Sequence, residues 1–298
     1  MSTTINLALD WYPNIIHGGI LIAQEAGYYA DAGLAVNIIS ADADQYATYP
    51  IEKLAVGIVD IAMAPSEHLM HYRENKWYHN LFALGAIGQR DMSAVAYRQG
   101  GGITRPADLD GRKIACYGTF FEVEILSAMI KADGGQGNFE VIHPGKLALW
   151  DFFLDGHADA CWMFPCWEGA MADVLGQPLG YFHLADYGIP YGQSPILIAN
   201  REAQLANPAI YQSFMEATAR GYQLMVQDPV EAMRIIEILK FSTAPTKAEI
   251  LAVMAAGMPY FLPNLLDSGG QWGRFDEVLS QTWHQWLWDH NCLARVLT

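Results

Sequence analysis

The sequence predicts an α/β protein whose parallel strands are covered by helices on both faces. Short apolar strands alternate with amphipathic helical stretches from the N-terminus to about residue 164, the pattern of successive βαβ units. From Asn207 onward the pattern becomes almost entirely helical. The chain has 298 residues, of which 52% are hydrophobic, enough for two lobes with separate cores.

The alternating region predicts eight strands and the helices between them. The expected strands, in chain order, are INLAL (5–9), LAVNIIS (34–40), DIAMA (60–64), HNLFALGAIG (79–88), MSAVAYR (92–98), KIACYG (113–118), FEVIHP (139–144) and ADACWMF (158–164). Helices are expected at 18–33, 49–57, 122–133 and 148–156. Parallel sheets bind ligands beyond the carboxyl ends of their strands, so candidate site residues are sought there.

The C-terminal third predicts a series of helices. The stretch 207–241 contains Asp228-Pro229, which splits it into two helices with Asp228 as the cap and Pro229 at the first helical position. Further helices are expected at 246–258 and 274–293. No low-complexity linker interrupts the chain, so strands should join the two lobes.

The charge balance excludes several classes of partner. The formal net charge is -15, from 32 acidic and 17 basic residues. So few cations argue against nucleic acid, whose binding depends on neutralising phosphates. No basic cluster suggests an anionic membrane surface, and no apolar run reaches the length of about 18 residues that spans a bilayer. We expect neither nucleic-acid binding nor membrane insertion.

The N-terminus and the cysteines indicate in which cellular compartment the protein is expected. The start MSTTINLALDW has no basic region followed by a long apolar run, so it is not a signal peptide. The expected location is cytoplasmic if Met1 is the native start and periplasmic if an export signal was removed. The four cysteines lack the spacing of metal ligands or of a disulfide scaffold, and we expect buried thiols at Cys116 and Cys161.

Known catalytic and metal motifs do not explain the chain. Neither GxSxG, HExxH, a Walker motif nor GxGxxG occurs in its required context. His68 and His71 are three residues apart, but a metal site needs further ligands. We therefore expect no metal, no cofactor and no catalytic residue.

The first strand end carries an unusual group of side chains. Trp11, Asn14 and His17 follow the strand INLAL, before the next helix is established. Aromatic residues at a strand end usually pack into a core. The alternative interpretation is that this turn forms one wall of a ligand site.

A second candidate segment is YGTFFEVE, which contains Tyr117, Gly118, Thr119 and Glu122. It links a strand to a helix start, where free backbone N–H groups bind anions or polar ligand atoms. Glu122 would repel a phosphate and suits a ligand that offers N–H donors. It is equally well explained as a first-turn acid favoured by the helix dipole.

A third segment, ADACWMFPCWEGAMA, combines aromatic residues with a carboxylate. Aromatic faces stack on flat π-systems, and a carboxylate can accept two N–H bonds from the edge of a flat ligand. The residues concerned are Trp162, Phe164, Trp167 and Glu168, and the later segment DYGIPYGQSP adds Tyr187 and Tyr191. The candidate site is thus aromatic and weakly acidic, without the Arg or Lys pair expected for an anionic ligand.

Several stretches together resemble one family. They are LDWYPNIIHGGILIAQEAGYYADAGLAV, VDIAMAPSEHL, ITRPADLDGRKIACYG, NPAIYQSFMEATARGYQLMVQDPVEA and GGQWGRFDEVLSQTWHQWL. In this order they resemble the ABC-type substrate-binding proteins of the sulfonate and thiamine-pyrimidine-precursor group, and the related fungal thiamine pyrimidine synthases.

The resemblance implies a two-lobed, type II periplasmic-binding-protein-like fold with the ligand in the interlobe cleft. Lobe I is then expected to contain 1–91 plus 193–298, and lobe II 92–192, with two crossings near 88–95 and 190–196. The segment MAPSEHL adds Pro65, Ser66 and His68 as ligand-binding candidates, although Ser66 could also cap the next helix.

The resemblance also separates binding from catalysis. His68 falls where the synthases carry the histidine that is consumed to build the pyrimidine. Their pyridoxal phosphate lysine, four residues earlier, corresponds to Ala64, and their cysteine-rich run corresponds to GIPYGQSPILIAN, which has no cysteine. These departures favour a protein that is not an enzyme.

The resulting hypothesis is a monomeric binding protein for a small heterocyclic ligand, a thiamine pyrimidine precursor such as a hydroxymethyl- or formylaminomethyl-pyrimidine. It would serve an ABC permease or thiamine salvage. The alternatives are a cytosolic thiamine pyrimidine synthase-like enzyme, or a binder of another flat or anionic ligand such as riboflavin, a sulfonate or an aromatic acid.

Overall fold

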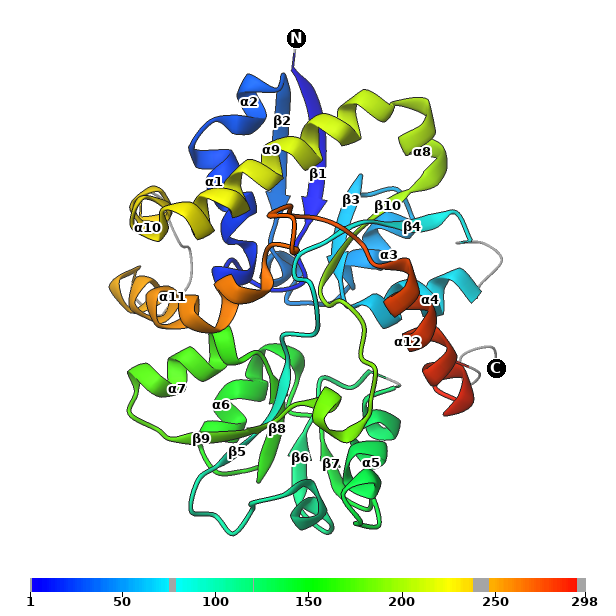
Figure 1. Cartoon of the computed structure of the whole chain (residues 1–298), viewed down its shortest axis with the longest axis vertical. Helices are drawn as coiled ribbons and strands as arrows, with labels where there is room; N and C mark the ends of the chain where they lie inside the picture. Colours follow the sequence, from blue (N-terminus) through cyan, green and yellow to red (C-terminus); the bar gives the residue numbers. More distant parts are fainter. Residues whose placement is uncertain (1, 75–78, 120, 238–246, 294–298) are drawn as a thin grey trace. The chain divides into compact units, whose positions relative to one another are not determined.

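The chain divides into two compact units (Figure 1). The computed structural model describes residues 2–74, 79–119, 121–237 and 247–293. Unit 1 comprises Met1–Asp91 and Gln193–Glu277, and unit 2 comprises Met92–Gly192 and Val278–Thr298. Each unit is built around one five-stranded sheet, and the two sheets are separate.

The C-terminal helix belongs to a different unit from the one we expected. Residues 193–298 were all assigned to lobe I, but the segment from Val278 onward lies in unit 2, so the chain passes between units three times. Trp283 is fully buried there, with its ring centroid 4.8 Å from that of Tyr191 and 5.2 Å from that of Trp286. The sequence indicates a helix at this place, but not the surface on which it packs.

The sheet of unit 1 has the strand order β2-β1-β3-β10-β4. Its strands are β1 Thr3–Ala8, β2 Leu34–Ile39, β3 Ile61–Ala64, β4 Leu81–Ala86 and β10 Ile196–Asn200. β1 pairs in parallel with β2 and β3, as expected, but β10 is antiparallel to both of its neighbours. The all-parallel expectation is wrong at β10 because this strand enters from unit 2 and does not follow a crossover helix of its own sheet.

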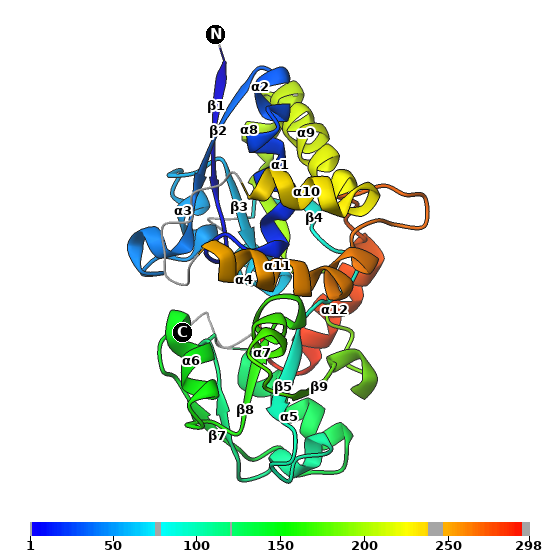
Figure 2. The same ribbon diagram turned by 90° about the vertical axis from the view of Figure 1, so that its left-hand side faces the viewer.

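Helices cover both faces of this sheet. They are α1 Gly18–Glu25, α2 Tyr28–Asp31, α3 Pro50–Ala55, α4 Ser66–Glu74, α8 Arg201–Ala206, α9 Pro208–Gln227, α10 Pro229–Ile236 and α11 Lys247–Phe261, with short 3-10 turns η1 Ile15–His17, η2 Ala41–Asp44 and η7 Leu262–Asn264. Figure 2 shows the sheet between α3 on one side and α1 with α9 on the other.

Two expected helix boundaries were tested by the structure. The helix expected at 18–33 is interrupted, because Gly27 adopts a left-handed conformation with φ 77° between α1 and α2. The expected break at Asp228-Pro229 is confirmed: the Asp228 Oδ1 atom accepts the Glu231 amide at 3.0 Å.

The crossing of α1 and α9 holds the first strand end in place. A Cβ atom added to Gly221 would lie 1.9 Å from the Gly19 carbonyl oxygen, so only glycine allows the two backbones to come this close. One residue later, the Tyr222 hydroxyl donates to the Ile16 carbonyl at 2.7 Å. Ile16 lies in η1, so this packing anchors the turn that follows β1.

Unit 2 contains a sheet with the order β7-β6-β8-β5-β9. Its strands are β5 Ala94–Arg98, β6 Lys113–Ala115, β7 Glu140–Ile142, β8 Ala160–Met163 and β9 Leu179–Phe182. β6 is parallel to β7 and β8, whereas β5 is antiparallel to β8 and β9. β5 therefore repeats the exception seen at β10, since it also follows a passage between units.

Within its described residues, unit 2 also contains four helices and four short helical elements. They are α5 Glu122–Ala132, α6 Leu149–Leu154, α7 Ala170–Val174 and α12 Glu277–Asp289, with the short elements η3 Pro106–Leu109, η4 Lys146–Ala148, η5 Pro165–Gly169 and η6 Leu184–Tyr187. Leu149 and Phe153 of α6 pack on Ala115 and Cys161 of the sheet. In the part of the chain that the structure describes, no helix combines the length and the apolar character needed to cross a membrane.

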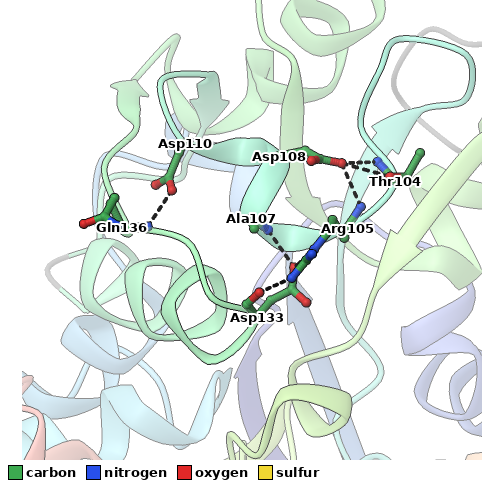
Figure 3. Close-up of polar contacts among 7 residues, drawn as sticks. All are labelled: Thr104, Arg105, Ala107, Asp108, Asp110, Asp133 and Gln136. Carbon is green, nitrogen blue, oxygen red and sulfur yellow. Dashed lines mark hydrogen bonds and ion pairs between the residues drawn. The ribbon is translucent and has the colours of Figure 1, made fainter.

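Three aspartates fasten the loops at one end of unit 2 (Figure 3). Asp133 accepts the Arg105 Nε atom at 2.7 Å and the Ala107 amide at 2.9 Å. Asp108 accepts the Thr104 amide at 2.8 Å, and Asp110 accepts the amide of Gln136. These hydrogen bonds favour the ionised carboxylates.

The same contacts lower the pKa of all three carboxyls below its usual value. For Asp133 the main cause is the hydrogen bond from Arg105, for Asp108 the Thr104 amide, and for Asp110 the amide of Gln136. An acid whose pKa is lower in the folded state stabilises the fold above its unfolded pKa. That contribution disappears as the pH falls through the folded pKa.

We therefore expect Asp133→Asn to lower the urea midpoint of unfolding at pH 7 and to have little effect at a pH below the folded pKa, where wild-type Asp133 is itself protonated. Urea titrations across this pH range check the prediction. Asp186→Asn, at an exposed position in the same unit, is the matched control. A difference between Asp133→Asn and wild type that persists unchanged at low pH would contradict the electrostatic explanation.

Candidate functional site

Aromatic side chains gather at the strand ends of unit 1. Trp11 and Tyr12 follow β1, are partly buried, and have ring centroids 5.3 Å apart. On its other side Trp11 lies 5.6 Å from the ring of Tyr46, which follows β2. Tyr46 is in turn 5.8 Å from Tyr49, and Tyr49 meets His68, just after β3, edge to face at 5.1 Å. One continuous aromatic row thus extends along the ends of three neighbouring strands.

Sequence reasoning missed Tyr46 and Tyr49. The signal was present in DQYATYP, two tyrosines placed just after the second expected strand. The backbone at Gln45 and Tyr46 has φ values of 55° and 59°, a left-handed conformation that is uncommon for residues with a Cβ. Burial, followed by the nearby Asp10 charge, raises the pKa of Tyr46 and keeps its hydroxyl protonated.

The polar atoms of Asn14 and His17 form hydrogen bonds within the turn that follows β1. The Asn14 Oδ1 atom accepts the Ile16 amide at 2.8 Å, and its Nδ2 atom donates to the Tyr12 carbonyl at 3.2 Å. The His17 Nδ1 atom accepts the Asn14 amide at 3.1 Å, which assigns the ring proton to Nε2, 2.9 Å from Asp10. Both side chains are buried, so they position the turn that carries Trp11.

The residues after β3 are also largely enclosed. Pro65 is partly buried, Ser66 is the first residue of α4 and His68 is buried within the same helix. The Ser66 hydroxyl lies 3.4 Å from the Glu67 carboxylate. Of these three candidates, His68 connects most directly to the aromatic row, through Tyr49.

The position expected for a cofactor lysine does not fit pyridoxal phosphate. Ala64 is the buried last residue of β3 and offers only a methyl group. Lys53, on α3, forms an ion pair with Asp44 at 3.0 Å. The amine that would bind the cofactor is therefore missing from this strand end.

In unit 2, the loop after β6 is held by hydrogen bonds to the buried Glu122 carboxylate. The two oxygens of Glu122 accept the Tyr117 amide at 2.9 Å and the Thr119 amide at 2.7 Å. Gly118 between them has φ 83°, which allows both amides to point inward. Glu122 is only 2% exposed, and burial raises its pKa while the amide hydrogen bonds oppose that rise.

A second carboxylate occupies the next strand end. Glu168 is 4% exposed, and its Oε2 atom accepts the Phe164 amide at 3.0 Å. It lies in η5, a single π-helical turn, a local geometry often found at functional sites. Glu122 and Glu168 therefore share one arrangement, a buried acid bonded to backbone amides at the carboxyl end of a strand.

The aromatic candidates of unit 2 differ in burial. Trp162 is buried, and its indole N–H donates to the Ser93 hydroxyl at 2.8 Å while its ring meets Tyr191 at 5.6 Å. Trp167 is 3% exposed, which is a core environment. Tyr117, Phe164 and Tyr187 remain partly exposed. Trp162 and Trp167 therefore pack within unit 2, and a contact of either with a ligand stays a prediction.

The pKa of the buried Cys161 thiol reflects the charged groups around it. Burial raises the pKa of Cys161, and the charges of Glu168, Cys116 and Glu122 raise it further. The expected buried thiols at Cys116 and Cys161 are confirmed, and their raised pKa values make them poor nucleophiles. Within the described residues, no group of His, Cys, Asp and Glu is arranged to hold a metal.

Known structures share the fold of this chain. The alkanesulfonate-binding protein SsuA from Xanthomonas axonopodis pv. citri superposes with a TM-score of 0.71 at 14% identity, covering 98% of this chain and 94% of that one. At this identity the match shows the fold alone. The chain therefore has the α/β fold of the periplasmic binding proteins, as expected.

Sequence relatives are more specific. A formylaminopyrimidine-binding protein of Halalkalibacterium halodurans is 27% identical over 236 residues, covering 78% of this chain and 69% of the relative. A 4-amino-5-hydroxymethyl-2-methylpyrimidine phosphate synthase of Saccharomyces cerevisiae is 23% identical over 246 residues, covering 78% and 71%. The family model described as NMT1/THI5 like matches residues 14–232, well over half of the chain. The protein is therefore a member of the NMT1/THI5-like family.

Proposed function

We propose that this chain is a non-catalytic binding protein for a neutral thiamine pyrimidine precursor, such as a formylaminomethyl- or hydroxymethyl-pyrimidine. The observation that carries the proposal is the pair of buried carboxylates, Glu122 and Glu168, at the strand ends of unit 2. Aminopyrimidines offer N–H donors along one edge, and a carboxylate is a strong acceptor for them. A relative of this chain is itself named for binding formylaminopyrimidine.

The aromatic row of unit 1 supports a flat ligand. Trp11 and Tyr12 are partly exposed, and Tyr46 with Tyr49 supports Trp11 from the side. Because Asn14 and His17 are occupied inside the turn, recognition on this unit depends on ring faces. Stacking against an aromatic ring contributes about 0.5–1.5 kcal/mol beyond the burial of area.

A synthase activity is the second candidate, because synthases occur among the relatives. Two features of this chain disfavour it. Ala64 supplies no amine for pyridoxal phosphate, and GIPYGQSPILIAN contains no cysteine where the fungal enzymes carry their cysteine cluster. His68 packs against Tyr49, which gives it a structural role.

The proposed physiological role is delivery of the pyrimidine to an ABC permease or to salvage enzymes by a monomeric protein. The fold shared with a solute-binding protein supports this role. The same fold supports a periplasmic location. Size-exclusion chromatography with light scattering measures the state of assembly.

The first functional prediction concerns Trp11. We expect Trp11→Ala to weaken pyrimidine binding by about 1–3 kcal/mol, because a stacking face and buried apolar area are lost together. Isothermal titration calorimetry with formylaminopyrimidine measures the change. Trp288→Ala is the matched control, since Trp288 is 56% exposed and should leave the affinity unchanged. Equal affinities of Trp11→Ala and wild type, with the fold intact, would assign Trp11 to packing alone.

The second functional prediction concerns Glu168. Glu168→Gln keeps the side-chain shape but replaces a charged acceptor with a neutral amide. A hydrogen bond to a charged group is worth about 1.5–3 kcal/mol, so pyrimidine affinity should fall roughly ten- to a hundredfold. Glu168→Asp should also weaken binding, since its shorter side chain cannot keep the same contacts.

The same variants separate the two ligand classes when they are titrated with formylaminopyrimidine and with an alkanesulfonate. A pyrimidine binder loses affinity on Glu168→Gln, whereas a sulfonate binder gains affinity because a repelling charge is removed. Glu140→Gln, at an exposed position in the same unit, controls for net charge. A pyrimidine affinity that stays within about twofold of wild type would remove Glu168 from the proposed contacts.

A further inference from the structure

One buried glutamine joins the three connections through which the chain passes between the units. Gln193 is the first residue of unit 1 after the second passage and is 3% exposed. Its Nε2 atom donates to the Gly88 carbonyl at 3.2 Å, shortly before the first passage. Nε2 also donates to the Arg274 carbonyl at 3.0 Å, and Oε1 accepts the Asp276 amide at 2.7 Å, next to the third passage. The Gln193 side chain therefore joins the unit 1 ends of all three connections.

An amide side chain matches these backbone partners. The two carbonyl groups need donors and the Asp276 amide needs an acceptor, and glutamine supplies N–H donors beside a carbonyl oxygen. A glutamate at this position would direct an oxygen at two carbonyl oxygens, and a methionine would remove all three hydrogen bonds. Because Gln193 is buried, either change leaves backbone groups without the partner that they have now, which costs free energy.

Further hydrogen bonds hold the first connection on both sides of Gly88. The Trp272 indole N–H donates to the Ile87 carbonyl at 3.0 Å. The Gln89 amide donates to the Asn264 carbonyl at 2.7 Å. Both partners belong to the segment of unit 1 that precedes the third passage. The first and third connections are therefore tied together up to Gln89.

In unit 2, aromatic side chains join the other ends of the same connections. The Trp162 indole N–H donates at 2.8 Å to the hydroxyl of Ser93, just after the first passage. The ring centroid of Trp162 lies 5.6 Å from that of Tyr191, just before the second passage. Tyr191 is in turn 4.8 Å from Trp283 on α12, the helix that the chain enters at the third passage. Each connection thus has a contact in unit 1 and another in unit 2.

We propose that Gln193 confines bending between the units to one short span in each connection. The spans are 90–92, Gly192 and the junction between Asp276 and Glu277. Domains that change their orientation do so at a few connecting residues, which absorb the change in φ and ψ. Because one side chain joins their unit 1 ends, the three spans bend together. Gln193 is a positioning residue, and the inference goes beyond the proposed function because it does not depend on the ligand.

The experiment compares wild type, Gln193→Glu and Gln193→Met by double electron–electron resonance without ligand. Spin labels are attached to Ala203→Cys in unit 1 and Ala132→Cys in unit 2, both at exposed helical positions. The native cysteines are buried, which directs the labels to the introduced thiols. We expect a wider distribution of inter-label distances in both Gln193 variants than in wild type, because the three connections are no longer joined.

Gln193→Glu allows a rescue that a general packing defect would not show. Once its carboxyl group is protonated, it donates an O–H bond to one carbonyl and still accepts the Asp276 amide. Lowering the pH should therefore narrow its distance distribution toward that of wild type, whereas Gln193→Met should keep its wide distribution. Gln24→Glu and Gln24→Met, at an exposed position of α1, are the matched controls and should equal wild type at each pH.

Amide hydrogen exchange distinguishes the proposed role from an ordinary structural hydrogen bond. Loss of the Gln193 acceptor should raise exchange at Asp276 about tenfold, the effect of one hydrogen bond. Folded Gln193 variants that show this faster exchange but keep the wild-type distance distribution would overturn the proposal. Equal widening in the Gln24 variants would overturn it too, because the effect would then not arise at the connections.

Wild-type protein provides a test that does not depend on the folding of a variant. The amides of Gln89 and Asp276 are hydrogen-bonded within unit 1 and should exchange slowly. The amides of 90–92 and Gly192 lie in the proposed spans and should exchange at least about tenfold faster. Equal protection at 90–92, Gly192 and Asp276 would contradict bending confined to these spans. Both measurements use ligand-free protein, so their failure is distinct from a failure to bind pyrimidine.

Discussion

The candidate chemistry of unit 2 depends on one kind of interaction, a buried carboxylate that accepts backbone amides at a strand end. Glu122 holds the amides of Tyr117 and Thr119, and Glu168 holds that of Phe164. Burying a charge is costly unless hydrogen bonds compensate for the lost water. Here main-chain amides donate hydrogen bonds to both carboxylates, and these bonds also fix the loops.

In unit 1, hydrogen bonds of Asn14 and His17 to nearby backbone groups and to Asp10 hold the turn after β1. The turn after β1 is closed by the Asn14 amide and the His17 ring, and Tyr222 of α9 fixes it from behind. Gly19 and Gly221 allow the two helices to approach closely enough for that contact. With its polar side chains committed inside the turn, this strand end presents aromatic rings. The strand ends of unit 1 thus carry aromatic rings, and those of unit 2 carry buried carboxylates.

Hydrophobic periodicity and the position of residues at strand ends predicted much of the fold and part of the candidate site. The alternation of strands and helices identified the fold class, and Asp228-Pro229 marked a helix start that the structure confirms. The directions of β5 and β10 were missed because local pattern does not encode how a strand enters a sheet. The placement of α12 was missed for a related reason, since Trp283 finds its partner Tyr191 about ninety positions away in sequence.

The roles of individual side chains were harder to predict than their positions. Asn14, His17 and Glu122 do lie at strand ends, but only three-dimensional contacts show that their polar atoms are engaged by nearby backbone groups. Tyr46 was missed because its loop has an irregular, left-handed backbone without periodicity. Composition indicated an acidic, aromatic site, whereas geometry distinguishes the residues that build it from those available to a ligand.

Native mass spectrometry tests the central claim most directly. The purified wild-type protein is mixed with equimolar formylaminopyrimidine and methanesulfonate, and the mass of the bound molecule is read from the intact complex. The proposed function predicts a single pyrimidine adduct at stoichiometric ligand. A methanesulfonate adduct in its place, or no pyrimidine adduct from folded protein, would contradict the claim.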